Sequence, residues 1–447
     1  MAARRRPLIA VIALGLAAGA GAPTPASAQP APPALALTHG VASGDATDDG
    51  AVIWARANRT ARMRVIFGTE PDDVGEGRGA RSSWAVLRGA RDFTGRVRLA
   101  GLRAGSVYFY RVQAYRGDER AQSAIASFTT PPSRSRAADV DFAWGADVGQ
   151  GLANRPPFPA FAAIADEAPD FFLFNGDTVY ADSITPAGPG AATRPEYWAK
   201  YKENRADPLF QALARETSLV VNWDDHEVAN DYRGPTQPLL PIGRAAFHDY
   251  WPLSVGPERV YRSLRWGREL ELFVIDARQY ADPLAEPDGP EKTMLGAEQR
   301  RWIEEAVRRS DATWKVIATS TPLSIQRSAE PPHDDWVSYE TELRGLLESW
   351  RTAGLRNLVW LTADVHWGQA IEYPEWSMWE FVGAPIGANP RAVASPLSPT
   401  FGPRSAFLAL DTRLYGSVSV DAPARRMTVT LKDETGAPLH REVLPAR

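Results

Sequence analysis

The sequence predicts an α/β protein that follows a small all-β sandwich. Three observations support this fold class: short strands with alternating apolar and polar residues fill residues 37–130, strands and amphipathic helices alternate from residue 139 onward, and several later strands end on acidic residues. Open α/β sheets bind ligands at the carboxyl ends of their strands. We therefore expect the functional site where those acidic residues gather.

The composition excludes several classes of function. The 447 residues are 44% apolar and 23% charged, which is ordinary for globular protein and enough for two or three domains. The formal net charge is −4 and the basic residues are scattered, so we expect no nucleic-acid partner and no polybasic membrane contact. The chain has no cysteine, which excludes disulfides, thiolate metal ligands and cysteine nucleophiles.

Residues 1–28 have the pattern of a cleavable export signal. Arginines occupy positions 4–6, a short apolar region rich in Ala and Gly follows, and an A-x-A cleavage site ends at Ala28. A membrane anchor is the alternative, which the short apolar region disfavours. The arginine pair also resembles a twin-arginine signal, so the twin-arginine or the general export machinery is the expected partner. We expect a periplasmic or secreted protein without a membrane span.

The rest of the chain divides into a β-sandwich and a larger α/β domain. Residues 29–36 are a Pro-rich lead-in, residues 37–130 contain the short strands of the sandwich, residues 131–138 form a linker, and residues 139–447 form the α/β domain. The sequence from Leu102 resembles fibronectin type III modules, in which a tyrosine packs at a strand corner. Its predicted role is structural support.

Two parallel strands deliver the first pair of carboxylates. VDFAWGAD ends at Asp147, a helix follows from Pro159, and FFLFNGD ends at Asp177, which together predict one βαβ unit. Neighbouring parallel strands bring both carboxylates to one edge. They repel each other unless a cation lies between them. Gly176 lets the backbone approach that cation, and Tyr180 is near enough to share it.

Three further strands end on polar residues. SLVVNWDDHE delivers Asp225 and His226, and ELFVIDAR delivers Arg278. LVWLTADVH ends at Asp364 and His366, and residues two apart on an extended chain point to the same side, so both are expected to point at one site.

Together these strand ends predict a site for two or three cations. Its ligands are mostly carboxylate oxygens with one imidazole and one phenolate, and Asp177 is the natural bridge. A metal-bound hydroxide would attack a phosphate ester, His226 would protonate the leaving alkoxide or stabilise charge, and Arg278 would bind the non-bridging phosphate oxygens. The predicted ligands are Asp147, Asp177, Tyr180, Asp225, Asp364 and His366.

The order of these motifs resembles a known family. DVGQG at Asp147, GDTVYAD at Gly176, WDDHEVAND at Trp223, DARQY at Asp276 and ADVHWG at Ala363 are similar to the motifs of PhoD-like alkaline phosphatases, within the calcineurin-like metallophosphoesterases. The resemblance covers residues 37 to 436. It implies an αββα sandwich of two mixed sheets flanked by helices.

The resemblance also implies cofactors. Asp147, Asp177, Tyr180 and His366 would hold ferric iron, and Asp177 would share calcium with Asp225 and Asp364. Some members have a cysteine where this chain has Asp147, so manganese or zinc would also suit the donor set.

The resemblance implies an exported, metal-dependent phosphatase that acts on small phosphate esters. Monoester and diester substrates are both possible, and the second includes a phosphodiesterase or phospholipase D-like activity. Loops 183–192 and 333–339 would determine how much space surrounds the phosphate, and so which substrate fits. The rival hypothesis is a non-catalytic, exported carbohydrate- or cell-wall-binding protein, in which Trp376 and Trp379 stack on sugar.

Overall fold

A computed structural model describes residues 33–327 and 335–447 of the chain. Leu35–Arg447 form one compact unit. The predicted export signal and the first half of the lead-in lie outside the described residues, as do the first two residues of loop 333–339. Within the described residues, no helix is both long enough and apolar enough to cross a membrane.

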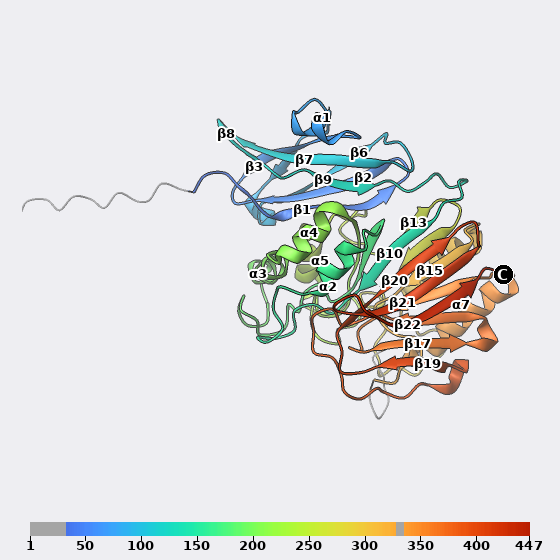
Figure 1. The fold of residues 1–447 in the computed structure, drawn as a ribbon. Helices are drawn as coiled ribbons and strands as arrows, with labels where there is room; N and C mark the ends of the chain where they lie inside the picture. The colour runs from blue at the N-terminus through green and yellow to red at the C-terminus, as the bar shows by residue number, and fades with distance from the viewer. Residues whose placement is uncertain (1–32, 328–334) are drawn as a thin grey trace, which may run out of the picture. The chain divides into compact units, whose positions relative to one another are not determined.

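Two mixed sheets form the centre of the fold (Figure 1). The first has nine strands in the order β22-β21-β20-β10-β11-β12-β1-β2-β6, and the second has seven in the order β13-β14-β15-β16-β18-β17-β19. The first consists of β1 (Leu37–Thr47), β2 (Gly50–Ala57), β6 (Thr94–Ala100), β10 (Val140–Gly145), β11 (Phe171–Asn175), β12 (Ser218–Asn222), β20 (Leu414–Asp421), β21 (Arg426–Asp433) and β22 (Pro438–Pro445). The second consists of β13 (Arg262–Trp266), β14 (Leu270–Val274), β15 (Trp314–Ala318), β16 (Leu358–Thr362), β17 (Gly368–Tyr373), β18 (Met378–Val382) and β19 (Arg404–Ala409).

The two sheets pack face to face through large apolar side chains. Phe142 and Phe171 stack with ring centroids 4.5 Å apart, and they share a buried cluster with Leu272 and Val316 of the other sheet. Since successive residues of a strand point to opposite faces, Phe172 faces the other way and packs against helices. Every central strand is therefore buried on both faces, which explains its unbroken apolar sequence.

Helices cover both outer faces. Helices α2 (Ala160–Asp166), α3 (Arg194–Arg205), α4 (Pro208–Glu216) and α5 (Leu240–Tyr250) pack on the nine-stranded sheet. Helices α6 (Gly296–Arg309) and α7 (Glu340–Thr352) pack on the seven-stranded sheet. This is the αββα sandwich that the family resemblance implied.

The predicted βαβ unit is present. β10 and β11 are parallel neighbours with Gly145 opposite Phe174, and α2 connects them. β12 continues the parallel arrangement beside β11, with Asn175 opposite Asn222. The loops that carry Asp147, Asp177 and Asp225 therefore leave the same edge of one sheet.

The N-terminal strands share a sheet with the rest of the fold. β1 runs parallel to β12, with Gly44 opposite Leu219, and β2 and β6 extend the same sheet. A Cβ at Gly44 would lie 2.8 Å from the Leu219 carbonyl oxygen, so this approach requires glycine. A third, six-stranded sheet packs on β1, β2 and β6; it consists of β3 (Ala61–Gly68), β4 (Ala80–Arg81), β5 (Ala85–Leu87), β7 (Val107–Arg116), β8 (Glu119–Gln122) and β9 (Ala126–Thr129). The predicted domain boundaries at residues 130 and 139 stay a prediction.

Candidate metal centre

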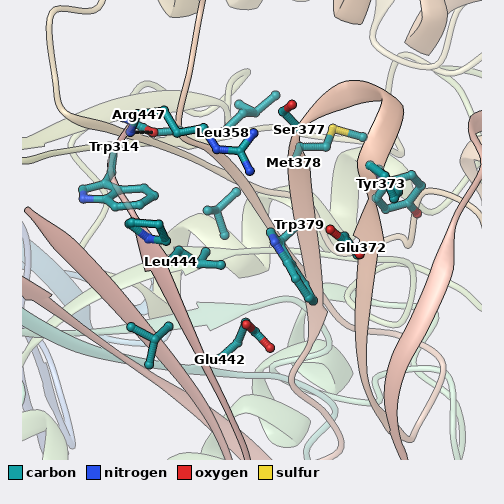
Figure 2. Close-up of a pocket in the computed structure, with 15 residues that line it drawn as sticks. Trp314, Leu358, Glu372, Tyr373, Ser377, Met378, Trp379, Glu442, Leu444 and Arg447 are labelled. Carbon is teal, nitrogen blue, oxygen red and sulfur yellow. Dashed lines mark hydrogen bonds between the residues drawn. The ribbon is translucent and has the colours of Figure 1, made fainter.

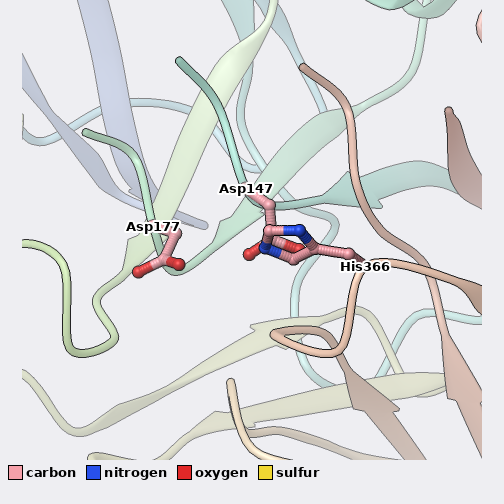
Figure 3. A group of neighbouring side chains, drawn as sticks. All are labelled: Asp147, Asp177 and His366. Carbon is pink, nitrogen blue, oxygen red and sulfur yellow. The ribbon is translucent and has the colours of Figure 1, made fainter. Parts of the chain in front are cut away.

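The loops that follow four strands converge at one end of the sandwich. They bring together two groups of buried side chains, each with one ligand atom per residue and all of these atoms within 4.8 Å of one another. The first group is Asp147, Asp177 and His366 (Figure 3). The second is Asp177, Asp224, Asp225 and Asp364. Asp177 belongs to both groups, as expected of a bridging ligand, and also to a third, less buried group with Asp225 and His226.

Four of these residues have left-handed backbone conformations. The φ angles are 61° for Asp147, 47° for Asp177, 71° for Asp364 and 63° for His366. Such angles are unfavourable for residues other than glycine and concentrate at functional sites. The extended-chain argument for Asp364 and His366 was therefore wrong. Both side chains reach the centre because the backbone turns sharply after β16.

Buried amides lock the two sheets together beside the centre. Asn175, the last residue of β11, donates from Nδ2 to the carbonyl oxygens of Thr319 at 2.9 Å and Leu361 at 3.1 Å. Asn222, the last residue of β12, donates to the carbonyl oxygen of Ile275 at 3.1 Å. The strand ends of the two sheets are thus held in fixed register, which fixes the loops that carry the carboxylates.

Glu227 ties two of the loops to each other. It accepts hydrogen bonds from the backbone N–H and the hydroxyl of Thr178, the latter at 2.6 Å, and from the backbone N–H of Asp224 at 2.8 Å. Its side chain is buried. Glu227 lies within the motif WDDHEVAND, to which sequence reasoning gave no role beyond Asp225 and His226.

His366 is oriented as a ligand. Its Nδ1 lies 2.8 Å from the carbonyl oxygen of Asn389, which can only accept, so the proton is on Nδ1 and Nε2 is free to bind. Nε2 lies 2.8 Å from the hydroxyl oxygen of Tyr180. Burial lowers the pKa of His366 to about 4, which keeps the imidazole neutral. A ring nitrogen of His366 lies within 4.8 Å of carboxylate oxygens of Asp147 and Asp177.

The carboxylates carry negative charge that the protein alone does not offset. Burial and neighbouring carboxylates raise the pKa of Asp147 and of Asp177 well above the usual range, and the pKa of Asp364 to about 7. Both oxygens of Asp147 and one oxygen of Asp177 have no hydrogen-bond partner in the described part of the chain. Buried polar atoms normally have partners. Cations would supply them, so the residues present fit a metal centre.

Arg278 is buried among the carboxylates of the second group. Its side chain is 0% exposed and its Nε bonds to Asp224. Nη2 lies 3.6 Å from Asp225 and 3.7 Å from Asp364. The guanidinium in this position offsets part of the charge of the second group of carboxylates. Its predicted role toward phosphate stays a prediction.

Sequence reasoning missed Arg327. Its Nη1 lies 2.6 Å from Asp364 Oδ2 and 3.7 Å from Asp231 Oδ1, and the side chain is 21% exposed. It is therefore more accessible to a ligand than the buried Arg278. The residue follows no strand that ends on a carboxylate, so no sequence pattern pointed to it.

His226 lies at the edge of the centre with a carboxylate partner. Its ring is 4.1 Å from that of Tyr180, and its Nε2 is 3.9 Å from Asp177 Oδ2. Nδ1 lies 2.8 Å from Asp182 Oδ1. Burial lowers the pKa of His226, but Asp225 and the Asp182 hydrogen bond outweigh burial and raise it to about 9. Asp182 was missed, although it ends the quoted motif GDTVYAD.

A separate cavity contains one of the tryptophans of the rival hypothesis. Trp379 lines a cavity of about 440 Å³ together with Glu372, Glu442 and Arg447 (Figure 2). Leu358, at the start of β16, also lines it, whereas Asp364 follows the end of that strand. The cavity and the metal centre therefore lie at opposite ends of β16.

The fold is that of the metallophosphoesterase-like proteins. The solved structure of PhoD matches with a TM-score of 0.76 at 22% identity, covering 91% of this chain and 88% of that one. The purple acid phosphatase PPD1 from yellow lupin (Lupinus luteus) seeds matches with a TM-score of 0.66 at 14% identity, covering 92% and 74%. The predicted fold class is confirmed.

Family comparison is more specific. Residues 142–431 match the PhoD-like phosphatase family, and residues 22–132 match the N-terminal domain of PhoD-like phosphatases. The chain belongs to the PhoD-like phosphatase family, which confirms the resemblance drawn from its motifs. Alkaline phosphatase D of Bacillus subtilis (strain 168) is 26% identical over 379 residues, covering 74% of this chain and 64% of that relative. The match thus spans just under two thirds of the relative's length.

Proposed function

We propose that this protein is an exported, metal-dependent hydrolase of phosphate esters. The observation that carries the proposal is Asp177, a buried carboxylate shared by two groups of potential ligands. A bridging carboxylate between two cation sites suits the in-line displacement of a phosphoryl group. Membership of a phosphatase family points to the same chemistry.

The residues of the chain divide the remaining tasks. Bound cations would acidify a water molecule and neutralise charge on the phosphoryl oxygens. His226, whose Nδ1 is held by Asp182, would donate its proton to the departing alkoxide. Arg327, at the partly exposed edge, would bind phosphate oxygens through its N–H groups. Arg278 would hold the carboxylates that bind the second cation.

We assign iron to the group with Tyr180 and His366, and calcium to the group with Asp225 and Asp364. The donor chemistry supports the assignment, because imidazole and phenolate suit a transition metal and an all-carboxylate group suits calcium. Manganese or zinc in the first group would leave the hydrolase proposal intact. Export rests on the sequence of residues 1–28.

One experiment tests metal content and activity together. The purified protein is analysed by plasma mass spectrometry and visible absorption, and assayed with p-nitrophenyl phosphate and bis(p-nitrophenyl) phosphate. We expect about two metal ions per chain, activity that is lost in EDTA and restored by metal, and a tyrosinate-to-iron band if iron is bound. The ratio of the two rates decides between monoester and diester. A protein that binds no metal and releases no phosphate would refute the proposal.

A further inference from the structure

The outer face of the six-stranded sheet carries arginines and aromatic rings in one continuous array. Met63 and Val65 of β3 point into the core, so Arg62 and Arg64 point outward. Residues opposite each other in register share a face. Arg62 lies opposite Tyr115 of β7, which lies opposite Arg120 of β8. We call Arg62, Arg64, Trp84, Tyr115 and Arg120 the arginine–aromatic ladder.

The members of the ladder contact one another. The guanidinium carbons of Arg62 and Arg64 lie 4.5 Å and 5.0 Å from the centre of the Trp84 ring. Arg120 lies 5.7 Å from the centre of the Tyr115 ring, and the two aromatic rings meet edge to face at 5.5 Å. Trp84 nevertheless stays 43% exposed. A large ring held in place by cations, with much of its surface in solvent, is preorganised for stacking.

The charge of the ladder is not neutralised within the described residues. Arg62 and Arg120 have neither a hydrogen bond nor a carboxylate partner there. Glu119, the nearest acidic residue along β8, alternates to the other face and lies 3.6 Å from Arg59. Arg64 donates to Gln113 Oε1, which also accepts from the Tyr115 hydroxyl, so that acceptor is occupied. The face therefore offers mainly donors and positive charge.

We propose that the arginine–aromatic ladder binds single-stranded nucleic acid, with guanidiniums on phosphates and the Trp84 ring on a base. Guanidinium N–H groups match phosphate oxygens bidentately, and stacking on an exposed indole is independent of base identity. A phosphodiester backbone offers acceptors only, which complements a face of donors. Sugar hydroxyls also need acceptors; Gln113 Oε1 is already occupied, which leaves the exposed amide of Gln122, opposite it in register, as an acceptor on this face. The proposal does not depend on hydrolysis at the metal centre.

This partner differs from the sequence-based expectation. The three arginines of the ladder belong to two strands that are distant in sequence, at positions 62, 64 and 120, so no basic run marks them. Only the pairing of β3 with β7 and of β7 with β8 places them on one face.

Fluorescence anisotropy of a labelled (dT)20 oligonucleotide with the full chain tests the proposal. We expect the logarithm of the binding constant to fall linearly with the logarithm of the salt concentration. The slope should be about −2, as three phosphate contacts would give. The double variant R62Q/R120Q should reduce the slope to about −0.7. W84A, or W84L if W84A misfolds, should weaken binding by at least about fivefold without changing the slope. The matched control is R98Q, because Arg98 is an exposed arginine of β6 in the nine-stranded sheet. This variant should bind as tightly as wild type.

Three outcomes would overturn the proposal. The first is the absence of wild-type binding at low salt. The second is equal binding by wild type and the ladder variants, or equal weakening in R98Q. The third is tighter binding of a labelled alginate oligomer with the same dependence on Trp84, which would assign the face to an acidic polysaccharide. Unchanged urea midpoints and p-nitrophenyl phosphate rates in all variants would show that the fold is intact.

Discussion

Nδ1 of His226 lies 2.8 Å from Oδ1 and 2.9 Å from Oδ2 of Asp182, so the carboxylate holds the imidazole by a shared hydrogen bond. Asp182 is itself fixed by the backbone N–H of Asn230 at 2.6 Å. The pair joins the loop after β11 to the loop after β12. Nε2 is left to face the metal centre, which is the orientation that a proton donor to the leaving group needs.

The first prediction concerns D182N. A raised pKa keeps His226 protonated below about 9, and protonation is lost as pH rises through that value. Removing the Asp182 charge lowers the pKa of His226. The decrease in kcat at alkaline pH, which follows loss of the His226 proton, should therefore occur at lower pH in the variant. We expect kcat at pH 9 to decrease about 10- to 100-fold. D48N, in the exposed turn between β1 and β2, is the control for a lost surface charge. An unchanged pH profile in D182N would remove His226 from the mechanism.

The second prediction concerns D177N. The amide cannot bridge two cations, so metal content should fall and activity should decrease by at least about 100-fold. In EDTA the variant should be more stable than wild type, because a neutral amide relieves the repulsion that raises the pKa of Asp177. Metal analysis and urea unfolding measure the two effects. Retention of full activity would refute the bridging role.

The third prediction concerns Gly176, which has a φ of 105°. A Cβ there would lie 2.9 Å from the Asp224 Cβ and 3.0 Å from the Ser320 Cβ. G176A should destabilise the protein by about 2–4 kcal/mol, since strain and overpacking add, and should displace the neighbouring ligand loop.

The matched control for G176A is G354A. Gly354 has a φ of 72° and nothing within 4 Å of the added Cβ, so only backbone strain of about 1–2 kcal/mol applies. Urea midpoints give both values, and p-nitrophenyl phosphate assays show whether activity is lost only in G176A. Equal losses of stability in G176A and G354A would mean that the loop at Gly176 relaxes around the added methyl group.

The fourth prediction concerns His248 on α5, which is 4% exposed. Burial and the arginines Arg96 and Arg262 lower its pKa from 6.5 to about 3. Between pH 6.5 and 3, His248 is therefore protonated in the unfolded chain but neutral in the folded protein. Stability falls as pH drops through this range. In H248Q the slope of unfolding free energy against pH in that range should be smaller by up to about 1.4 kcal/mol per pH unit. Parallel wild-type and variant curves would contradict this.

Much of the architecture could be predicted from the chain alone. Apolar strands such as Phe171–Asn175 and Leu358–Thr362 are buried on both faces, so their sequences are continuously apolar and easily recognised. Strand-end carboxylates such as Asp147 and Asp177 could be grouped because parallel neighbours end at one edge. The pattern of βαβ units constrains topology strongly, and the ordered motifs identified the family.

The remaining features depend on contacts between distant segments. Asp182 beside His226, Arg327 beside Asp364 and the burial of Arg278 follow from how the loops fold over the centre. The left-handed backbone at Asp364 and His366 could not be read from an alternating pattern, since non-glycine residues rarely adopt it.

By itself, the sequence determined the fold class, the family and the set of carboxylates at the strand ends, because those depend on local periodicity and on strand neighbours. Only the tertiary structure decided which charges are paired, which are exposed and which aromatic rings meet them. Arg62 and Arg120 became one surface through sheet register, and Arg278 became a buried counter-charge through loop packing. The free energy of a charge depends on its solvation and on neighbours within a few ångströms, and both are properties of the folded chain.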